Sequence, residues 1–185
     1  MFTDVDENAW YGFNQGKVIA RAYEYGLMKG DSATTFNPTG NMTVAEAITV
    51  AARVHSIYMT GEESFAQSSP WYKVYVDYAI DKGIIKSDDF TDYTRAATRA
   101  EMAYIFSKSL PAAEFAEQNT VNSLPDVNSD TPYYNAILTL YKAGIVTGND
   151  DKGTFSPGNN ITRAEAAAII SRVILPATRV SGKMY

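Results

Sequence analysis

The sequence predicts an all-α protein built from helix-loop-helix repeats, and three observations support this class. A four-residue phrase recurs at intervals of about sixty residues, which marks a tandem repeat. Each copy places Thr three residues before Glu and ahead of an apolar run, which is the capping box that begins a helix. Apolar residues then recur at helical spacing after each box. The copies are Thr43-Val44-Ala45-Glu46, Thr98-Arg99-Ala100-Glu101 and Thr162-Arg163-Ala164-Glu165.

Each repeat also predicts an earlier helix that ends at a glycine. In the middle copy, apolar residues between Trp71 and Ala79 follow helical spacing and stop before Gly83. The third copy does the same before Gly144. In the first copy the interval from Trp10 to Gly26 is longer by about one helical turn, so we expect a longer helix with the same apolar face.

Turn-rich segments separate these elements. Residues 31–38 and 149–160 are rich in Asn, Asp, Gly, Ser and Pro, as loops are. Residues 60–70 and 110–123 are polar connectors. The repeats therefore span 1–60, 61–118 and 119–175, followed by a patternless tail, 176–185. A lone helix pair cannot bury its apolar face, so the repeats must pack into one unit, as a solenoid or a closed bundle.

Five landmarks recur in one order: Asp-Val, an aromatic pair, Gly-Ile-x-x-Gly, Phe-x-Pro and Thr-Arg-Ala-Glu. This order resembles the S-layer homology (SLH) domain in a tandem set of three, over roughly residues 1 to 175. The middle copy is the most diverged, because it lacks the Asp-Val entry and has Ser87 in place of the second glycine.

The resemblance implies a compact pseudo-threefold bundle with grooves between its lobes. It also implies a secreted protein that is held non-covalently on the bacterial cell wall or in an S-layer. The expected partner is secondary cell-wall polysaccharide, commonly through a pyruvylated N-acetylmannosamine. The alternative is a helical repeat scaffold for protein-protein or S-layer self-assembly contacts. We expect no cofactor and a monomeric module.

The composition excludes several other classes. A net charge of −5 and a pI near 4.9 argue against nucleic acid and anionic membranes as partners. The absence of cysteine excludes disulfides, Cys-based zinc sites and thiol catalysis. No apolar run reaches the roughly 18 residues that a membrane span needs, and no signal peptide is visible after Met1. No catalytic motif is present, so we expect no enzyme; a glycan hydrolase is a distant third hypothesis.

The repeated arginines are the leading candidates for binding a glycan. Arg99 and Arg163 stand at the first position of a helix, where the macrodipole disfavours a cation by roughly 0.3–1 kcal/mol. A guanidinium beside free helix amides could clamp a carboxylate. The alternative is an ion pair with a neighbouring acidic residue. In the first copy Val44 replaces the arginine, which weakens the clamp there.

The other candidates each have a structural alternative. Aromatic side chains could stack on sugars or only pack, the aspartates could bond hydroxyls or cap a helix, and the glycines could admit a ligand or serve a turn. These glycan-binding candidates are Trp10, Trp71, Tyr72, Tyr133, Asp4, Asp126, Gly30 and Gly148. Six residues are assigned to capping rather than chemistry: Thr43, Glu46, Thr98, Glu101, Thr162 and Glu165. We expect no metal site, because His55 is the only histidine.

Overall fold

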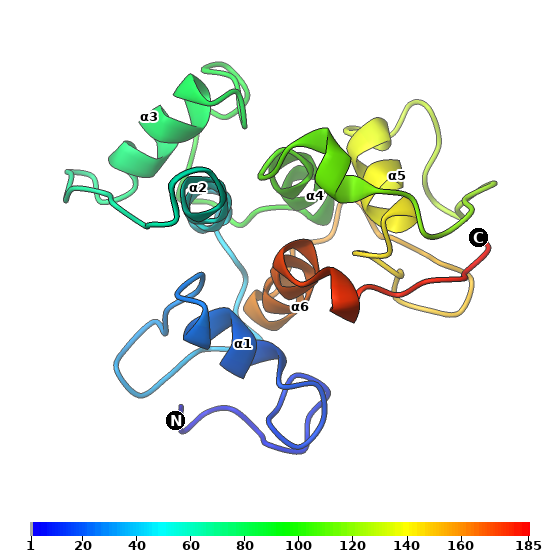
Figure 1. Cartoon of the computed structure of the whole chain (residues 1–185), viewed down its shortest axis with the longest axis horizontal. Coiled ribbons are helices and arrows are strands. Elements are labelled where there is room, and N and C mark those ends of the chain that lie inside the picture. The colour runs from blue at the N-terminus through cyan, green and yellow to red at the C-terminus, as the bar shows by residue number, and fades with distance from the viewer. Residues whose placement is uncertain (1) are drawn as a thin grey trace.

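The computed structural model of the chain describes residues 2–185, and within that range it is helical with no strand (Figure 1). The all-α class of helix-loop-helix repeats is confirmed. The described part of the chain forms six α-helices and two short 3-10 helices, in the order α1 (Val18–Glu24), α2 (Val44–Thr60), α3 (Lys73–Asp81), α4 (Arg99–Ser107), η1 (Ala112–Phe115), α5 (Tyr134–Lys142), α6 (Arg163–Ile174) and η2 (Pro176–Thr178).

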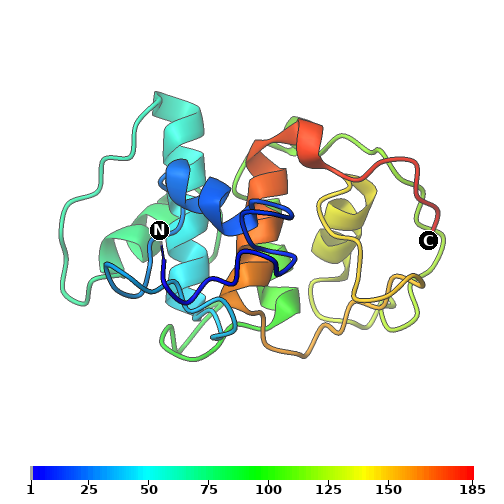
Figure 2. The ribbon, with the colours of Figure 1, turned by 90° about the horizontal axis from the view of Figure 1, so that it is seen from below.

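The three predicted capping boxes are all formed. Thr43, Thr98 and Thr162 are the N-caps of α2, α4 and α6. Each Thr hydroxyl accepts from the backbone N–H three residues on, and the Glu there accepts from the Thr N–H. These helices carry nearly half of the buried apolar residues, and all three begin at the same end of the molecule (Figure 2).

The first helix of each repeat was predicted to end before a glycine, and this helix agrees with the prediction in the second and third repeats. α3 and α5 precede Gly83 and Gly144, which have φ of 70° and 71°. The longer helix expected in the first repeat is wrong: α1 begins only at Val18, and turns fill most of the segment before it. Gly12 explains part of this, because a Cβ there would lie 2.2 Å from the Asp6 carbonyl oxygen, so the chain folds back on itself.

A closed ring of backbone hydrogen bonds joins the three repeats where the central helices begin. The Met42 N–H donates to Ile161 O at 2.9 Å, Ile161 N–H donates to Ala97 O at 3.1 Å, and Ala97 N–H donates to Met42 O at 2.8 Å. Each of these residues lies just before a capping box. Because the ring needs one strand-like residue from every repeat, it couples all three.

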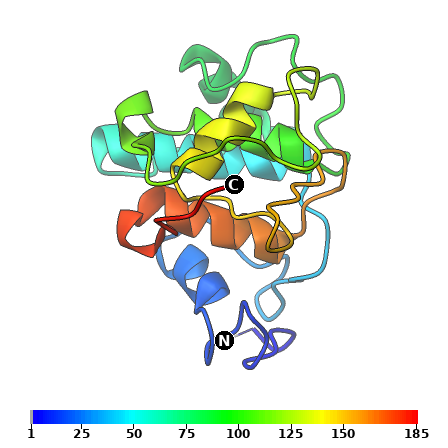
Figure 3. The same ribbon diagram turned by 90° about the vertical axis from the view of Figure 1, so that its right-hand side faces the viewer.

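The first helix of each repeat packs on the second helix of the repeat before it, and the first repeat follows the third in this cyclic order. α3 packs on α2 and α5 on α4, while α1 packs on α6, which closes the circle. Figure 1 shows α2, α4 and α6 at the centre with α1, α3 and α5 around them, and Figure 3 shows α1 and α5 on opposite sides of α6. Each lobe therefore combines helices from two repeats.

The C-terminal tail is more ordered than its patternless sequence indicated. Tyr185 N–H donates to Thr120 O at 3.0 Å and Asn122 N–H donates to Tyr185 O at 2.7 Å. The Val180 N–H donates to Gly144 O at 2.9 Å. The tail thereby pairs with the connector before α5 and rests on the third repeat.

Candidate functional site

One groove collects three of the predicted glycan-binding residues. Gly30, Trp71 and Arg163 line a hollow of about 250 Å³ that we call groove 1. Its other lining residues include Lys29, Glu46 and Arg53. The groove therefore takes residues from the glycine turn, from α2, from the start of the second repeat and from the third repeat.

Arg163 is one of two buried cations in groove 1. Its Nε donates to Phe36 O at 2.9 Å, its Nη1 to Glu46 Oε1 at 2.6 Å and its Nη2 to Lys29 O at 2.7 Å. The predicted alternative, an ion pair with a neighbouring acidic residue, is thus present. A guanidinium has five N–H donors, so these three bonds leave two for a further acceptor.

Arg53 is the second buried cation of groove 1, and it was not among the residues predicted from the sequence. Its Nη1 donates to Leu27 O at 3.4 Å and its Nη2 to Tyr75 Oη at 3.2 Å. Its Nε lies 2.8 Å from Glu63 Oε1, as an ion pair without hydrogen-bond geometry. The available signal was position: Arg53 follows Glu46 by the same interval as Arg172 follows Glu165.

Residues of the third repeat bind Arg99 of the second repeat in the same way as residues of the first repeat bind Arg163. Arg99 Nε donates to Phe155 O at 2.7 Å and Nη1 donates to Glu165 Oε1 at 2.8 Å. Arg172 Nη1 donates to Ile145 O at 3.1 Å, as Arg53 does to Leu27. Burial lowers the pKa of Arg172, and no carboxylate within residues 2–185 forms an ion pair with it.

The middle repeat departs from this arrangement. Val44 of the first repeat is fully buried at the position where the other two repeats have arginine, and Glu101 of the middle repeat is bound instead by Arg95, at 2.6 Å. Arg95 is much more exposed than Arg99 or Arg163, with 41% of its side chain accessible against 6% and 7%. Glu101 therefore forms its ion pair with an exposed arginine of its own repeat, whereas Glu46 and Glu165 each pair with an arginine of another repeat.

The central helices offer no free amides at their first turn, which corrects one argument for an anion clamp. The Arg163 N–H donates to Gly40 O at 2.9 Å and the Arg99 N–H to Asn159 O at 2.8 Å. The next amides, of Ala164 and Ala100, donate to Pro38 O and Pro157 O. Neighbouring loops thus occupy the positions that an anion would need.

The predicted aromatic residues divide into exposed and packed ones. Trp10 and Trp71 are each 53% exposed and stand edge-on to the next tyrosine. Tyr72 packs against Tyr93. Tyr133 stacks on Tyr104, with ring centroids 4.5 Å apart. Of the four predicted aromatic residues, Trp71 is the one that lines groove 1.

Asp4 and Asp126 have a role that neither of the expected alternatives described. Asp4 accepts from the N–H groups of Phe36 and Asn37 at 2.8 and 2.7 Å. Asp126 accepts from the matching amides of Phe155 and Ser156. Burial raises the pKa of Asp4, but the two backbone bonds outweigh it and hold the pKa below the usual value.

The local backbone requires a glycine at both predicted positions, Gly30 and Gly148, because a side chain there would collide with neighbouring backbone atoms. At Gly30 a Cβ would lie 2.4 Å from the carbonyl oxygens of Ser32 and Thr35. Gly148 has φ of 80°, which favours glycine, and its Cβ would lie 2.7 Å from the Gly153 backbone. Gly30 nevertheless lines groove 1, so turn geometry and groove lining coincide there.

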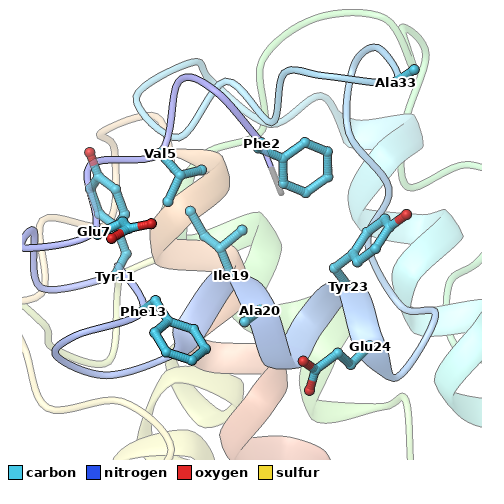
Figure 4. Close-up of a pocket in the computed structure, with 10 residues that line it drawn as sticks. All are labelled: Phe2, Val5, Glu7, Tyr11, Phe13, Ile19, Ala20, Tyr23, Glu24 and Ala33. Atoms are coloured by element: carbon cyan, nitrogen blue, oxygen red, sulfur yellow. The ribbon is translucent and has the colours of Figure 1, made fainter.

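A second hollow, of about 320 Å³, is formed by the N-terminal segment and α1 (Figure 4). Phe2, Phe13, Ile19 and Tyr23 line it, and its lining includes no cation. It contains none of the predicted site residues, and its charged lining residues are glutamates. It is a poorer match than groove 1 for an acidic ligand.

Neither a metal centre nor a membrane segment is found between residues 2 and 185. No group of three metal-ligating side chains occurs there. The helices of this part of the chain are too short or too polar to cross a bilayer.

The fold defines an all-α repeat module in which residues of all three repeats line groove 1. Residues 2–48 and 123–167 match the S-layer homology domain family. The chain therefore carries S-layer homology domain sequence in its first and third repeats. The middle repeat lies outside these matches, although it has the same capping box and takes part in the same backbone ring.

Known proteins resemble nearly the whole chain. It is 29% identical over 198 residues to the Surface-layer 125 kDa protein of Lysinibacillus sphaericus, covering 97% of this chain and 16% of that protein. It is 30% identical to the Amylopullulanase of Thermoanaerobacterium thermosulfurigenes, covering 91% of this chain and 9% of the relative. A 52-residue stretch is 46% identical to the S-layer protein of Bacillus thuringiensis subsp. finitimus, covering 28% of this chain and 6% of that protein. The chain thus spans under a fifth of these relatives.

Proposed function

We propose that this chain anchors a surface protein non-covalently to the bacterial cell wall by binding secondary cell-wall polysaccharide. The S-layer homology matches and the S-layer names of two relatives support this proposal. The shared segment also recurs in a protein named as a glycan-degrading enzyme, of which it covers only 9%. A module common to proteins with such different names is better explained by attachment than by catalysis.

Groove 1 carries the proposal. It combines a broad exposed indole, Trp71, with two buried guanidiniums, Arg53 and Arg163. The indole offers an apolar face for a sugar ring, and the guanidiniums offer planar donors for a carboxylate. An acidic sugar such as a pyruvylated N-acetylmannosamine fits this pair of features.

Because the protein has a net charge of −5, the attraction between groove 1 and an acidic sugar has to act over a short range. The overall field of the protein repels an acidic glycan, so binding depends on charge-assisted hydrogen bonds at short range. The two N–H groups that Arg163 leaves unused suit this role. We propose a second site at the corresponding residues Arg99, Arg172 and Gly148, within a pseudo-threefold arrangement of the three repeats.

Cell-wall binding tests the function directly. The purified chain should sediment with bacterial cell walls and should stay in solution when the secondary polysaccharide has been removed chemically. Equal binding to both preparations would contradict the proposal. A chain that ignores walls but associates with itself would favour the scaffold alternative.

Calorimetry with a pyruvylated N-acetylmannosamine tests groove 1. We expect Trp71→Ala to weaken binding about two- to tenfold, since one stacked aromatic ring contributes on the order of 0.5–1.5 kcal/mol. Tyr23→Ala is the matched control, because Tyr23 is 54% exposed but lies in the other hollow. Removal of the pyruvate should cancel most of the affinity.

A further inference from the structure

The protein places a carboxylate of its own against the second cation of groove 1. Glu63, in the connector between α2 and α3, has Oε1 2.8 Å from Arg53 Nε. Only 9% of the Arg53 side chain is exposed, against 26% of the Glu63 side chain. An internal carboxylate thus occupies one side of a guanidinium that, in the proposed function, binds an acidic sugar.

This contact compensates the charge of Arg53 but does not satisfy its hydrogen bonding. Arg53 Nε is buried and has no hydrogen-bond partner within residues 2–185, although the Glu63 carboxylate is so close. A buried N–H without an acceptor costs free energy. A ligand carboxylate with good hydrogen-bond geometry would gain the bond that Glu63 does not make. The internal pair is therefore one that a better-oriented ligand can replace.

The equivalent cations of the other two repeats have no such carboxylate. Lys108 and Arg172 follow the capping glutamates of their repeats by the same interval as Arg53 follows Glu46. In the described chain neither Lys108 nor Arg172 forms an ion pair. The pair with Glu63 is thus particular to groove 1 and is not explained by the architecture that the repeats share.

The connector that carries Glu63 has few contacts with the rest of the chain. It leaves α2 at Gly61, which has φ of 80°, and runs as an open loop to α3 (Figure 2). Over residues 63–67 the described structure has no backbone hydrogen bond. Phe65 anchors the loop, with its ring 4.7 Å from that of Tyr75. Segments with so few backbone bonds open at low free energy, so Glu63 can leave Arg53 without the unfolding of a helix.

Arg53 keeps its other contacts when Glu63 moves away. Its Nη2 donates to Tyr75 Oη at 3.2 Å, and its guanidinium carbon lies 5.3 Å from the centroid of the Tyr75 ring. Its Nη1 donates to Leu27 O. These contacts come from α3 and from the glycine turn, not from the connector. Release of Glu63 therefore leaves an oriented guanidinium with an unused N–H.

We propose that Glu63 is an internal competitor in groove 1, and that an acidic ligand displaces it from Arg53 on binding. The inference rests on the proposed function, because it takes the ligand to be the acidic sugar of the cell-wall polysaccharide. Exchange of one carboxylate for another keeps the buried charge of Arg53 compensated in both states. The competition lowers the affinity of groove 1 for acids in general and favours a ligand that also contacts Trp71.

A nuclear magnetic resonance titration of the whole chain with a pyruvylated N-acetylmannosamine, read at the Trp71 indole N–H, tests this competition. Glu63→Gln should bind about two- to fivefold more tightly than the unmodified chain, because a partly exposed ion pair contributes modestly. Glu62→Gln is the matched control, since Glu62 forms no ion pair within residues 2–185. It removes the same charge one residue away, so the affinity should change less than about 1.5-fold. Thermal melting checks that each variant is folded.

A double variant shows whether Glu63 acts through Arg53. In an Arg53→Gln background, Glu63→Gln should give no gain in affinity, because no guanidinium remains to be released. A gain of the same size there would assign the effect to the net charge. Weaker binding by Glu63→Gln alone would make the ion pair a support of the groove. Either result would overturn the inference.

The same titrations separate this inference from the proposed function. Equal affinity of the unmodified chain, Glu63→Gln and Glu62→Gln, with cell walls still bound, would overturn the competition and leave the anchoring role intact. Absence of binding to the monosaccharide and to cell walls, in both the unmodified chain and Glu63→Gln, would contradict the proposed function and this inference with it.

Discussion

At the scale of single residues, the shared arginines act as cross-links between repeats. Arg163 of the third repeat reaches Glu46 of the first, and Arg99 of the second reaches Glu165 of the third. Each glutamate also caps its own helix, so one carboxylate serves both functions. The cation beside a helix N-terminus is thereby placed against a carboxylate, which offsets the macrodipole.

Arg163→Ala should therefore destabilise the fold as well as weaken glycan binding. Removing one partner of a largely buried pair leaves the other uncompensated, and we expect a loss of about 2–3 kcal/mol because Glu46 is partly exposed. Urea unfolding measures the loss. Arg95→Ala is the control, since this exposed pair with Glu101 should contribute less than about 1 kcal/mol.

His55 should give the stability a dependence on pH near neutrality. Burial, and then the charge of Lys82, lower the pKa of His55 below its usual 6.5. The unfolded chain thus takes up a proton first as the pH falls, so the unfolding free energy should decrease from pH 6.5 down to the folded pKa. Unfolding of His55→Gln should lack this slope; an unchanged slope would assign it to other groups.

At the scale of helices, local sequence signals were sufficient where the contacts are local. The capping boxes involve residues only three positions apart, so Thr43, Thr98 and Thr162 could be placed from the sequence. The start of α1 could not, because the turns before it depend on the backbone folding against Asp6. Likewise, Asp4 bonds a loop more than thirty residues away, which periodicity does not reveal.

Loss of one capping hydroxyl should have a modest and measurable cost. Thr162→Ala removes the acceptor for the Glu165 N–H and should cost about 1 kcal/mol, which lowers Tm by about 2–4 °C in a domain of this size. Thr162→Ser retains the hydroxyl and should melt close to the unmodified chain. A larger loss in both variants would point to the packing of the Thr methyl group.

At the scale of the whole molecule, the site could be predicted only in part. The sequence identified Gly30, Trp71 and Arg163 through repeated landmarks, but their meeting in groove 1 depends on contacts between three repeats. Arg53 was missed because a lone arginine within a helix resembles any surface cation.

The closed order of the repeats predicts that the chain unfolds as one unit. Removing residues 1–60 would take away α1 from α6, Glu46 from Arg163 and Met42 from the backbone ring. The remaining segment, 61–185, would then expose apolar surface of α6 and leave the Arg163 charge unpaired. We expect it to melt broadly or to be unfolded at 25 °C, because so small a remnant loses much of its core.

Calorimetry of the segment 61–185 beside the full chain measures this cooperativity. Mixing it with a separate 1–60 fragment is the matched control, since reassembly should restore a sharp transition if the ring is what the segment lacks. A segment 61–185 that melts as sharply as the intact chain would show that the second and third repeats are self-sufficient. The Arg163–Glu46 bridge and the α1–α6 contact would then be accessory to the fold, and closure of the three repeats could not be the source of its stability.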